Sequence, residues 1–252
     1  PERHCFSGVT LLSGVFFMSV MSSSLPKSNA KRLDVRTIVC TGMLCAIAYV
    51  VMFISKTIFA PIPVAGFLTF DLKDVIIAIG GFLYGPLNAL CISVITSLIE
   101  MVTVSETGPI GLLMNVLSTI AFVCPAAFIY KRRQTLSAAV AGLVTGGILM
   151  TGIMLLWNYL ITPLYMNVPR DVVVAMLPTA FLPFNLVKAL MNGALTMLLY
   201  KPVVTALRKA RLAPEHESTA QVQKRRTIGI SIVAVILLAT AVLLGLVLAG
   251  VI

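Results

Sequence analysis

Long apolar segments constrain this chain more than any other feature of its sequence. About 20 apolar residues are needed for a helix to cross a bilayer. Runs of suitable length occur at 36–56, 87–103, 108–130, 136–160, 180–204 and 227–252. A shorter run at 73–85 ends at Gly85-Pro86 and predicts a short or tilted helix. We therefore expect an all-α membrane protein, with a six-helix transmembrane bundle over 33–205 and one extra C-terminal transmembrane helix over 227–252.

The composition agrees with a membrane protein and limits its chemistry. Of the 252 residues, 59% are hydrophobic and only 11% charged. No GxxxxGK[ST] loop is present, so the chain is not expected to hydrolyse ATP by itself. The net charge of +10 does not predict nucleic-acid binding, because the basic residues are confined to particular loops without interleaved aromatics.

The cysteines and histidines favour no metal or redox site. The five cysteines show no CxxC spacing, and four of them fall in apolar runs, which is typical of small packing residues. His4 and His216 lie in the polar ends of the chain. We expect no metal and no cofactor.

Two stretches of the chain, one N-terminal and one before the last span, are predicted to lie outside the bundle. Residues 1–32 form an N-terminal segment, in which 5–20 has the length of a signal-peptide core but no A-x-A cleavage site follows. Alternatively Met18 or Met21 is the true start. Residues 206–226 are predicted to be a basic linker.

Most Lys and Arg residues fall on one predicted side of the membrane. They precede the first span, follow the span ending at residue 130 as Lys131-Arg132-Arg133, and fill the 206–226 linker. The positive-inside rule then places the N-terminus in the cytoplasm of a multi-pass cell-membrane protein. The opposite loops, 55–74 and 158–179, are apolar and contain several prolines, which favours a lid above a pocket.

Three polar residues share one face of the 180–204 helix. Asn185, Lys188 and Asn192 are spaced three and four residues apart. A lysine at bilayer depth costs at least about 2.5 kcal/mol, so it normally faces a cavity, a partner or a ligand. Glu100 is the one acid that falls within a predicted span. We therefore expect Lys188 to face a ligand rather than a carboxylate.

Other polar residues are candidates for the same site. Asn158 lies between Trp157 and Tyr159, a combination suited to a planar heteroaromatic ligand, although the two rings could form an interfacial belt. Glu100 and Asn115 are further candidates. Glu100 could instead be solvated, and Asn115 could bond a neighbouring helix.

Gly42, Ala46 and Ala48 place small residues along the first span. Such a face lets another helix approach closely, either a partner subunit or a helix of the same bundle. Acidic midplane sites and repeats between two halves, common in ion-driven transporters, are not evident. A binding protein energised by a partner fits the sequence better.

Four blocks in this order resemble the substrate-binding S components of energy-coupling factor (ECF) vitamin transporters, in particular the riboflavin-specific type. They are "FLTFDLKDVIIAIGGFLYGPLNAL" (67–90), "GPIGLLMNVLSTIAFVCPAAFIYKRR" (108–133), "NYLITPLYM" (158–166) and "LPFNLVKALMNGALTMLLYK" (182–201). The sequence departs from the family pattern at Lys73-Asp74, where Ser-Asp or Ser-Glu is usual, and in the seventh span.

The resemblance implies a bundle that captures riboflavin from outside and docks on a transmembrane coupling subunit joined to two ATPases. It assigns flavin contacts to Asn158, Asn185, Lys188, Leu68 and Thr69, and partner docking to the small residues of the first span. Riboflavin would be a transported ligand, and the chain would not be an enzyme.

Three alternatives remain. The ligand could be another vitamin or a flavin analogue, or the chain could be a solitary facilitator. An intramembrane enzyme could use Lys188 as base or nucleophile, but no companion Ser, Cys or acid stands at convincing spacing.

Overall fold

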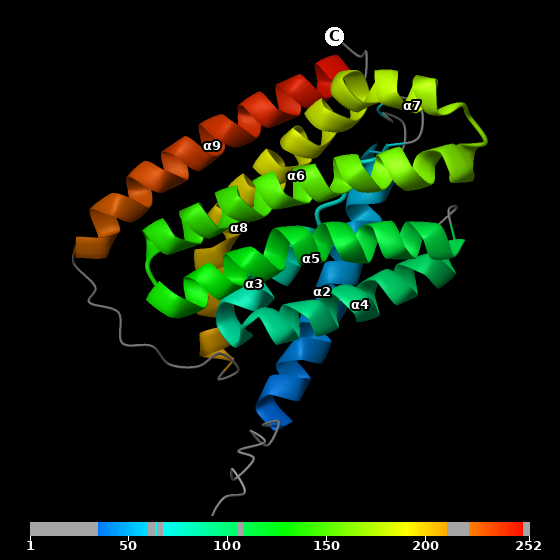
Figure 1. The fold of residues 1–252 in the computed structure, drawn as a ribbon. Helices are drawn as coiled ribbons and strands as arrows, with labels where there is room; N and C mark the ends of the chain where they lie inside the picture. The colour runs from blue at the N-terminus through cyan, green and yellow to red at the C-terminus, as the bar shows by residue number, and fades with distance from the viewer. Residues whose placement is uncertain (1–34, 60–63, 65–67, 105–107, 211–221, 249–252) are drawn as a thin grey trace, which may run out of the picture. The chain divides into compact units, whose positions relative to one another are not determined.

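The computed structural model describes residues 35–59, 64, 68–104, 108–210 and 222–248, which are almost entirely helical (Figure 1). The helices are α2 (Val35–Phe59), α3 (Lys73–Tyr84), α4 (Pro86–Thr103), α5 (Gly108–Arg133), α6 (Leu136–Met166), α7 (Arg170–Met176), the π-helix η1 (Leu177–Phe181), α8 (Leu182–Lys209) and α9 (Val222–Leu248). Extended pairing in the described residues is limited to an isolated bridge between Val64 and Leu68. The all-α class is confirmed for this part of the chain.

Within the part of the chain that the structure describes, five helical segments are long and apolar enough to cross a membrane. They are Val35–Phe59, Pro86–Thr103, Gly108–Arg133, Leu136–Leu164 and Arg170–Leu207. α3 has only 12 residues, and the apolar stretch found in α9 is the shorter Ala234–Leu248. The count of six spanning helices plus one therefore stays a prediction. The N-terminal segment 1–32 lies outside the described residues.

α3 is the central helix of the bundle. Every residue from Lys73 to Phe82 is buried, and the helix packs against α2, α4, α5 and α8. It ends at Gly85, whose φ of 95° favours glycine, and Pro86 begins α4, where a missing N–H is not needed. The bundle thus encloses the first turn of α3 together with its two charged side chains.

Small residues bring α5 and α6 close together. A Cβ on Gly142 would lie 2.8 Å from the Ala126 carbonyl oxygen, and a Cβ on Gly146 would overlap the Phe122 carbonyl. Glycine at both positions lets the two backbones touch, as is usual between membrane helices.

The expected long outer loop at 158–179 is wrong. α6 continues to Met166, and helical structure resumes at Arg170 and runs through η1 into α8. Of the three prolines, only Pro169 lies in the short gap between α6 and α7. Pro163 lies inside α6, Pro169 precedes the first turn of α7, and Pro178 falls in the first turn of η1. Membrane bundles tolerate such prolines because neighbouring groups pair with the freed carbonyls.

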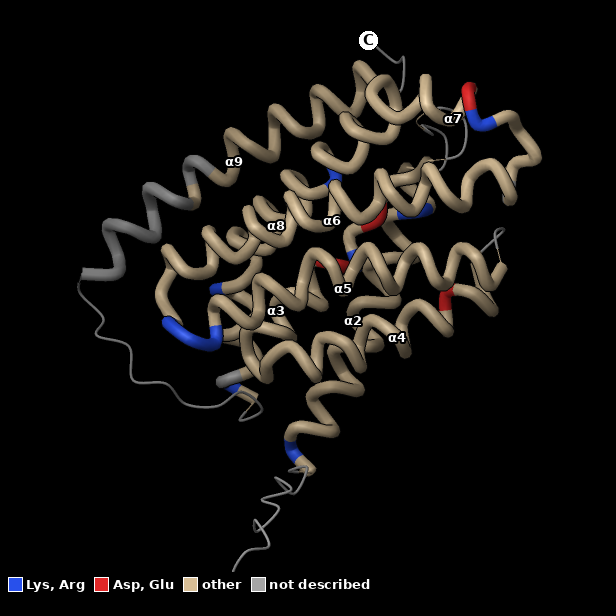
Figure 2. Tube along the Cα trace, viewed as in Figure 1, with Lys and Arg blue, Asp and Glu red and all other residues tan. Residues whose placement is uncertain are grey.

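Most charged residues of the described chain lie near helix ends or around the start of α3 (Figure 2). Lys131, Arg132 and Arg133 end α5 just before α6 begins, whereas Arg170 and Asp171 begin α7 just after α6 ends. The basic turn and the mixed-charge turn are therefore at opposite ends of the long helix α6. The orientation of the N-terminus stays a prediction.

Candidate functional site

Three lysines and three carboxylates meet around the first turn of α3, and we call them the charged cluster. Its members are Lys56 of α2, Asp71, Lys73 and Asp74 at the start of α3, Glu100 of α4 and Lys188 of α8. All except Lys56 are less than one-tenth exposed. The positive and negative charges are equal in number, so the cluster can be buried as a paired network.

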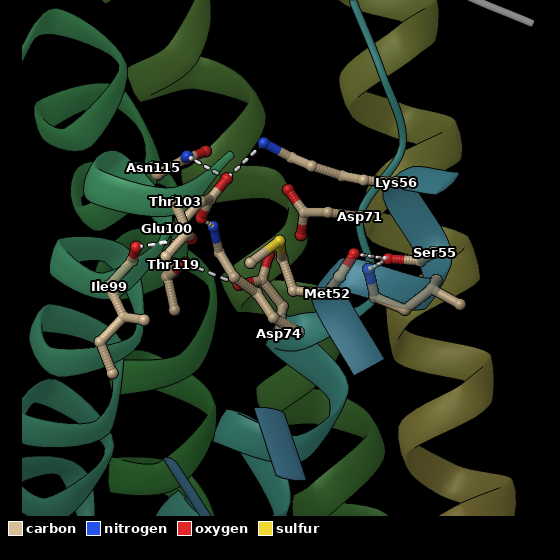
Figure 3. A network of polar contacts seen from close by, with 12 residues as sticks. Met52, Ser55, Lys56, Asp71, Asp74, Ile99, Glu100, Thr103, Asn115 and Thr119 are labelled. Atoms are coloured by element: carbon tan, nitrogen blue, oxygen red, sulfur yellow. Dashed lines mark hydrogen bonds and ion pairs between the residues drawn. The ribbon is translucent and has the colours of Figure 1, made fainter. Parts of the chain in front are cut away.

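Glu100 is the acceptor of one half of the charged cluster (Figure 3). Its two carboxylate oxygens lie 2.5 Å from the Nζ atoms of Lys56 and Lys73. The Asn115 amide donates a hydrogen bond of 3.0 Å to Oε1 of the same carboxylate. Glu100 is thus fully buried and paired rather than solvated, and Asn115 bonds a neighbouring helix.

Lys188 anchors the other half. Its Nζ donates a 3.1 Å hydrogen bond to Oδ2 of Asp71 and lies 4.0 Å from Oδ2 of Asp74. The other oxygen of Asp74 accepts a 2.6 Å hydrogen bond from Thr119 of α5. The expectation that no carboxylate reaches Lys188 is wrong, because the chain before α3 folds inward and brings Asp71 to α8.

The segment Leu68–Leu72 that carries Asp71 is fixed at several points. Leu68 pairs with Val64 through two backbone hydrogen bonds, and the Leu72 N–H donates to the Ser55 hydroxyl of α2. The Asn192 amide of α8 donates to the Asp71 carbonyl at 3.4 Å. The segment is therefore held against both α2 and α8.

The lysines also set the charge of Asp71. Burial raises the pKa of its carboxyl, but the charges of Lys188 and Lys73 and the hydrogen bond from Lys188 outweigh burial and hold the pKa at about 2, below the ordinary 3.8. Asp71 is therefore ionised at physiological pH and competes for the Lys188 ammonium.

Two predicted amides turn toward their own helices. Asn158 donates to the Met154 carbonyl and accepts a hydrogen bond from Thr162, all within α6. Asn185 donates to the Phe181 carbonyl at 2.8 Å. Both side chains are buried. The structure therefore gathers Lys188, Glu100 and Asn115 in the charged cluster, while Asn158 and Asn185 make local bonds.

Some buried polar atoms near these residues make no hydrogen bond in the described part of the chain. They are Oδ1 of Asp71, Oδ2 of Asp74, Oδ1 of Asn192 and Nε1 of Trp157. Buried polar atoms are normally paired, so each such atom needs a reason. Three acceptors and one donor are consistent with a site that a polar ligand completes.

Two cavities found in the described residues are not lined by Lys188. A shallow apolar depression of about 440 Å³ is lined by residues of α5 and α6 together with Pro86. A void of about 30 Å³ lies between Phe70, Val187 and α9. Drug-sized ligands usually need about 300–1,000 Å³. Neither cavity therefore offers a ligand-sized space at Lys188.

The small residues of α2 do not share one environment. Gly42 and Ala46 are exposed, and a Cβ on Gly42 would meet no atom within 4 Å. Ala48 is fully buried and packs in the core with Leu44. The open face of α2 therefore includes Gly42 and Ala46 but not Ala48.

Together the helical bundle and its enclosed charged cluster define a polytopic membrane protein with a polar site inside. Residues 36–204 match the family described as ECF transporter, substrate-specific component. The chain belongs to this family. The match ends before α9.

Relatives with known names support the assignment. The chain is similar to riboflavin transporter RibU of Staphylococcus aureus, with 27% identity over 69% of this chain and 93% of the relative. It is similar to riboflavin transporter FmnP of Bacillus subtilis, with 27% identity over 71% of this chain and 100% of the relative. A solved structure described as "Structure and mechanism of the S component of a bacterial ECF transporter" has a TM-score of 0.57 and 25% identity, covering 68% of this chain and 97% of that one.

Sequence reasoning missed Asp71, Lys73 and Asp74. The signal was the stretch "DLKD" at 71–74, three charges beside an apolar helix. They were assigned to an outer loop, and nothing in the sequence pairs Asp71 with a lysine 117 positions later.

Proposed function

We propose that this chain binds riboflavin from outside the cell and passes it to an ECF transporter for import. The observation that carries the proposal is similarity to riboflavin transporters over 93–100% of their length. The residues are chemically suitable. The flavin ring edge offers carbonyls and ring nitrogens to Lys188, Asn185 and Asn158, and the ribityl hydroxyls can pair with free carboxylate and amide oxygens.

Riboflavin binding at Lys188 requires the segment Leu68–Leu72 to move. Asp71 is ion-paired with the Lys188 ammonium group, and Lys188 lines neither of the two cavities described above. We infer that the structure shows the site in a closed form, with Asp71 held against Lys188. Leu68 and Thr69 belong to the same segment, so its outward movement would uncover the lysine and bring both residues to the ligand.

A direct test measures ligand binding by the purified full chain. Riboflavin fluorescence should be quenched at submicromolar protein, and mass spectrometry of co-purifying small molecules should detect a flavin. Competition by other vitamins or flavin analogues distinguishes a different ligand. Folded protein that neither retains nor quenches riboflavin would reject the proposal.

We also propose that α2 docks on a transmembrane coupling subunit, which is joined to two ATPase subunits. Gly42 and Ala46 are exposed and small, so a partner helix can approach closely. Gly42→Leu should leave riboflavin binding unchanged and impair uptake by the assembled transporter. The matched control is Gly152→Leu on α6, where a Cβ also meets open space. Normal uptake by Gly42→Leu would contradict this docking face.

Uptake in vesicles separates a transporter component from a solitary facilitator. The proposal expects riboflavin uptake only when the coupling subunit and ATPases are present. Uptake by the chain alone would favour the facilitator.

A further inference from the structure

α9 lies beyond the residues that match the family, yet it packs on the proposed site. Its inward positions are Ala234, Leu238, Ala241, Gly245 and Leu248, spaced four and three residues apart. This spacing places them on one side of the helix, which packs against α8. Residues between these inward positions, such as Val242 and Leu243, are exposed. α9 therefore has a specific inner face rather than a uniformly apolar surface.

The inner face of α9 reaches Phe70. A Cβ on Gly245 would lie 3.5 Å from the Phe70 ring and 3.7 Å from Val187. Phe70 immediately precedes Asp71, and Val187 immediately precedes Lys188. α9 thus touches the neighbours of both members of the ion pair that closes the site.

Phe70 is the point where four parts of the chain meet. Its ring centroid lies 4.7 Å from that of Phe184 in α8 and 5.8 Å from that of Phe59 at the end of α2. Ala241 of α9 belongs to the same buried cluster. If Phe70 moves outward, Asp71 moves with it, because the two residues are adjacent in a short segment.

We propose that α9 is a positioning element for the riboflavin site, with Gly245 allowing it to rest on Phe70 and Val187 and so hold Asp71 against Lys188. The inference rests on the proposed riboflavin function. α9 sets how readily the segment Leu68–Leu72 opens, and therefore how fast the ligand enters and leaves.

Gly245→Leu tests the proposal in the full chain. The larger side chain cannot fit against Phe70, so α9 is pushed outward. Amide hydrogen exchange at residues 68–72 of the ligand-free protein and the dissociation rate of riboflavin should each rise about tenfold. Gly245→Ala should behave as wild type, because its Cβ makes ordinary contacts and the adjacent void of about 30 Å³ gives room.

Gly152→Leu is the matched control and should change neither readout, since residue 152 faces open space on α6. Leu238→Ala, which removes an anchor of α9 without adding bulk, should change both readouts in the same direction by less. Exchange at 68–72 and riboflavin dissociation that stay at wild-type values in both Gly245→Leu and Leu238→Ala would overturn the proposal. Exchange that rises equally in α3 and α5 would also overturn it, because the effect would then be general destabilisation.

The two measurements, hydrogen exchange at residues 68–72 and riboflavin binding, distinguish a failure of this inference from a failure of the proposed function. If the wild-type chain fails to bind riboflavin, the proposed function is rejected, and hydrogen exchange still decides whether α9 holds the segment that carries Asp71.

Discussion

The two ends of α3 are buried in opposite surroundings, one charged and one aromatic. The first turn is surrounded by the charged cluster and leaves oxygens of Asp71 and Asp74 without hydrogen bonds in the described residues. At the last turn Phe82 packs against Tyr130 and Tyr200, whose hydroxyls share a 2.7 Å hydrogen bond. One end keeps unused polar capacity and the other is apolar and paired. We propose from this difference that the charged end binds the ligand and that the aromatic end contributes mainly to stability.

The largest effect is expected at the aromatic end. Phe82→Ala should lower the free energy of unfolding by about 3 kcal/mol or more, because it opens a cavity among buried rings. The riboflavin dissociation constant of the folded protein should not change. Chemical denaturation measures the free energy of unfolding, and a separate riboflavin titration of the folded protein measures the dissociation constant. Phe128→Ala, at a half-exposed site, is the control, and a weakened affinity in Phe82→Ala would contradict the division between the two ends.

At the charged end the main effect should be on affinity. Lys188→Ala should weaken riboflavin binding by about 1–3 kcal/mol, since ligand acceptors lose their donor. Fluorescence titration measures the change, with Lys201→Ala, an exposed lysine of the same helix, as control. Unchanged affinity in Lys188→Ala would remove this lysine from the site.

Asn185 gives a smaller and sharper test. Its amide donates to the carbonyl of Phe181, the last residue of η1, so it must turn to meet a ligand. Asn185→Ala should weaken binding by about 1 kcal/mol, at the low end of the range for a lost hydrogen bond. Riboflavin titration measures the affinity of the variant. An affinity equal to that of the wild type would mean that Asn185 has only a structural role.

A modest stability effect is expected from the tyrosine pair. Tyr130→Phe removes one hydroxyl of the 2.7 Å hydrogen bond and should lower the free energy of unfolding by about 1 kcal/mol. Tyr49→Phe is the control, because its hydroxyl bonds Thr103 at an exposed position. A larger loss in Tyr49→Phe than in Tyr130→Phe would contradict the stabilising role of the half-buried Tyr130–Tyr200 pair.

A last prediction concerns how the contribution of Asp71 to stability depends on pH. Its pKa is lowered in the folded state, so ionisation stabilises the fold above the ordinary value of 3.8, and this contribution disappears as the pH falls toward about 2. The stability difference between wild type and Asp71→Asn should be constant from pH 7 to 5 and should shrink below pH 4. A difference that does not depend on pH would exclude this ion pair as its source.

Much of the fold could be predicted from the sequence, because apolar length and glycine–proline turns are local signals. The start of α3 at Lys73 and the Gly85-Pro86 break are examples. The helices around Pro163 and Pro178 were missed because proline was interpreted as a breaker, whereas a packed membrane bundle can accommodate it. The choice of Lys188 as an interior residue followed from the cost of burying its charge, whereas for Glu100 a solvated position was left open. Their partners could not be predicted, because tertiary packing alone brings Asp71 to Lys188.

The shortness of α3 fixes how deep the cargo travels before any large motion. Twelve residues rise about 18 Å, whereas the hydrocarbon layer is about 30 Å thick. If the last turn of α3 lies at the cytoplasmic surface, as the proposed orientation has it, a ligand on its first turn would lie below the outer membrane surface. The bound ligand would then already have moved part of the way across the membrane, and the ATP-driven step would have to carry it over a shorter distance.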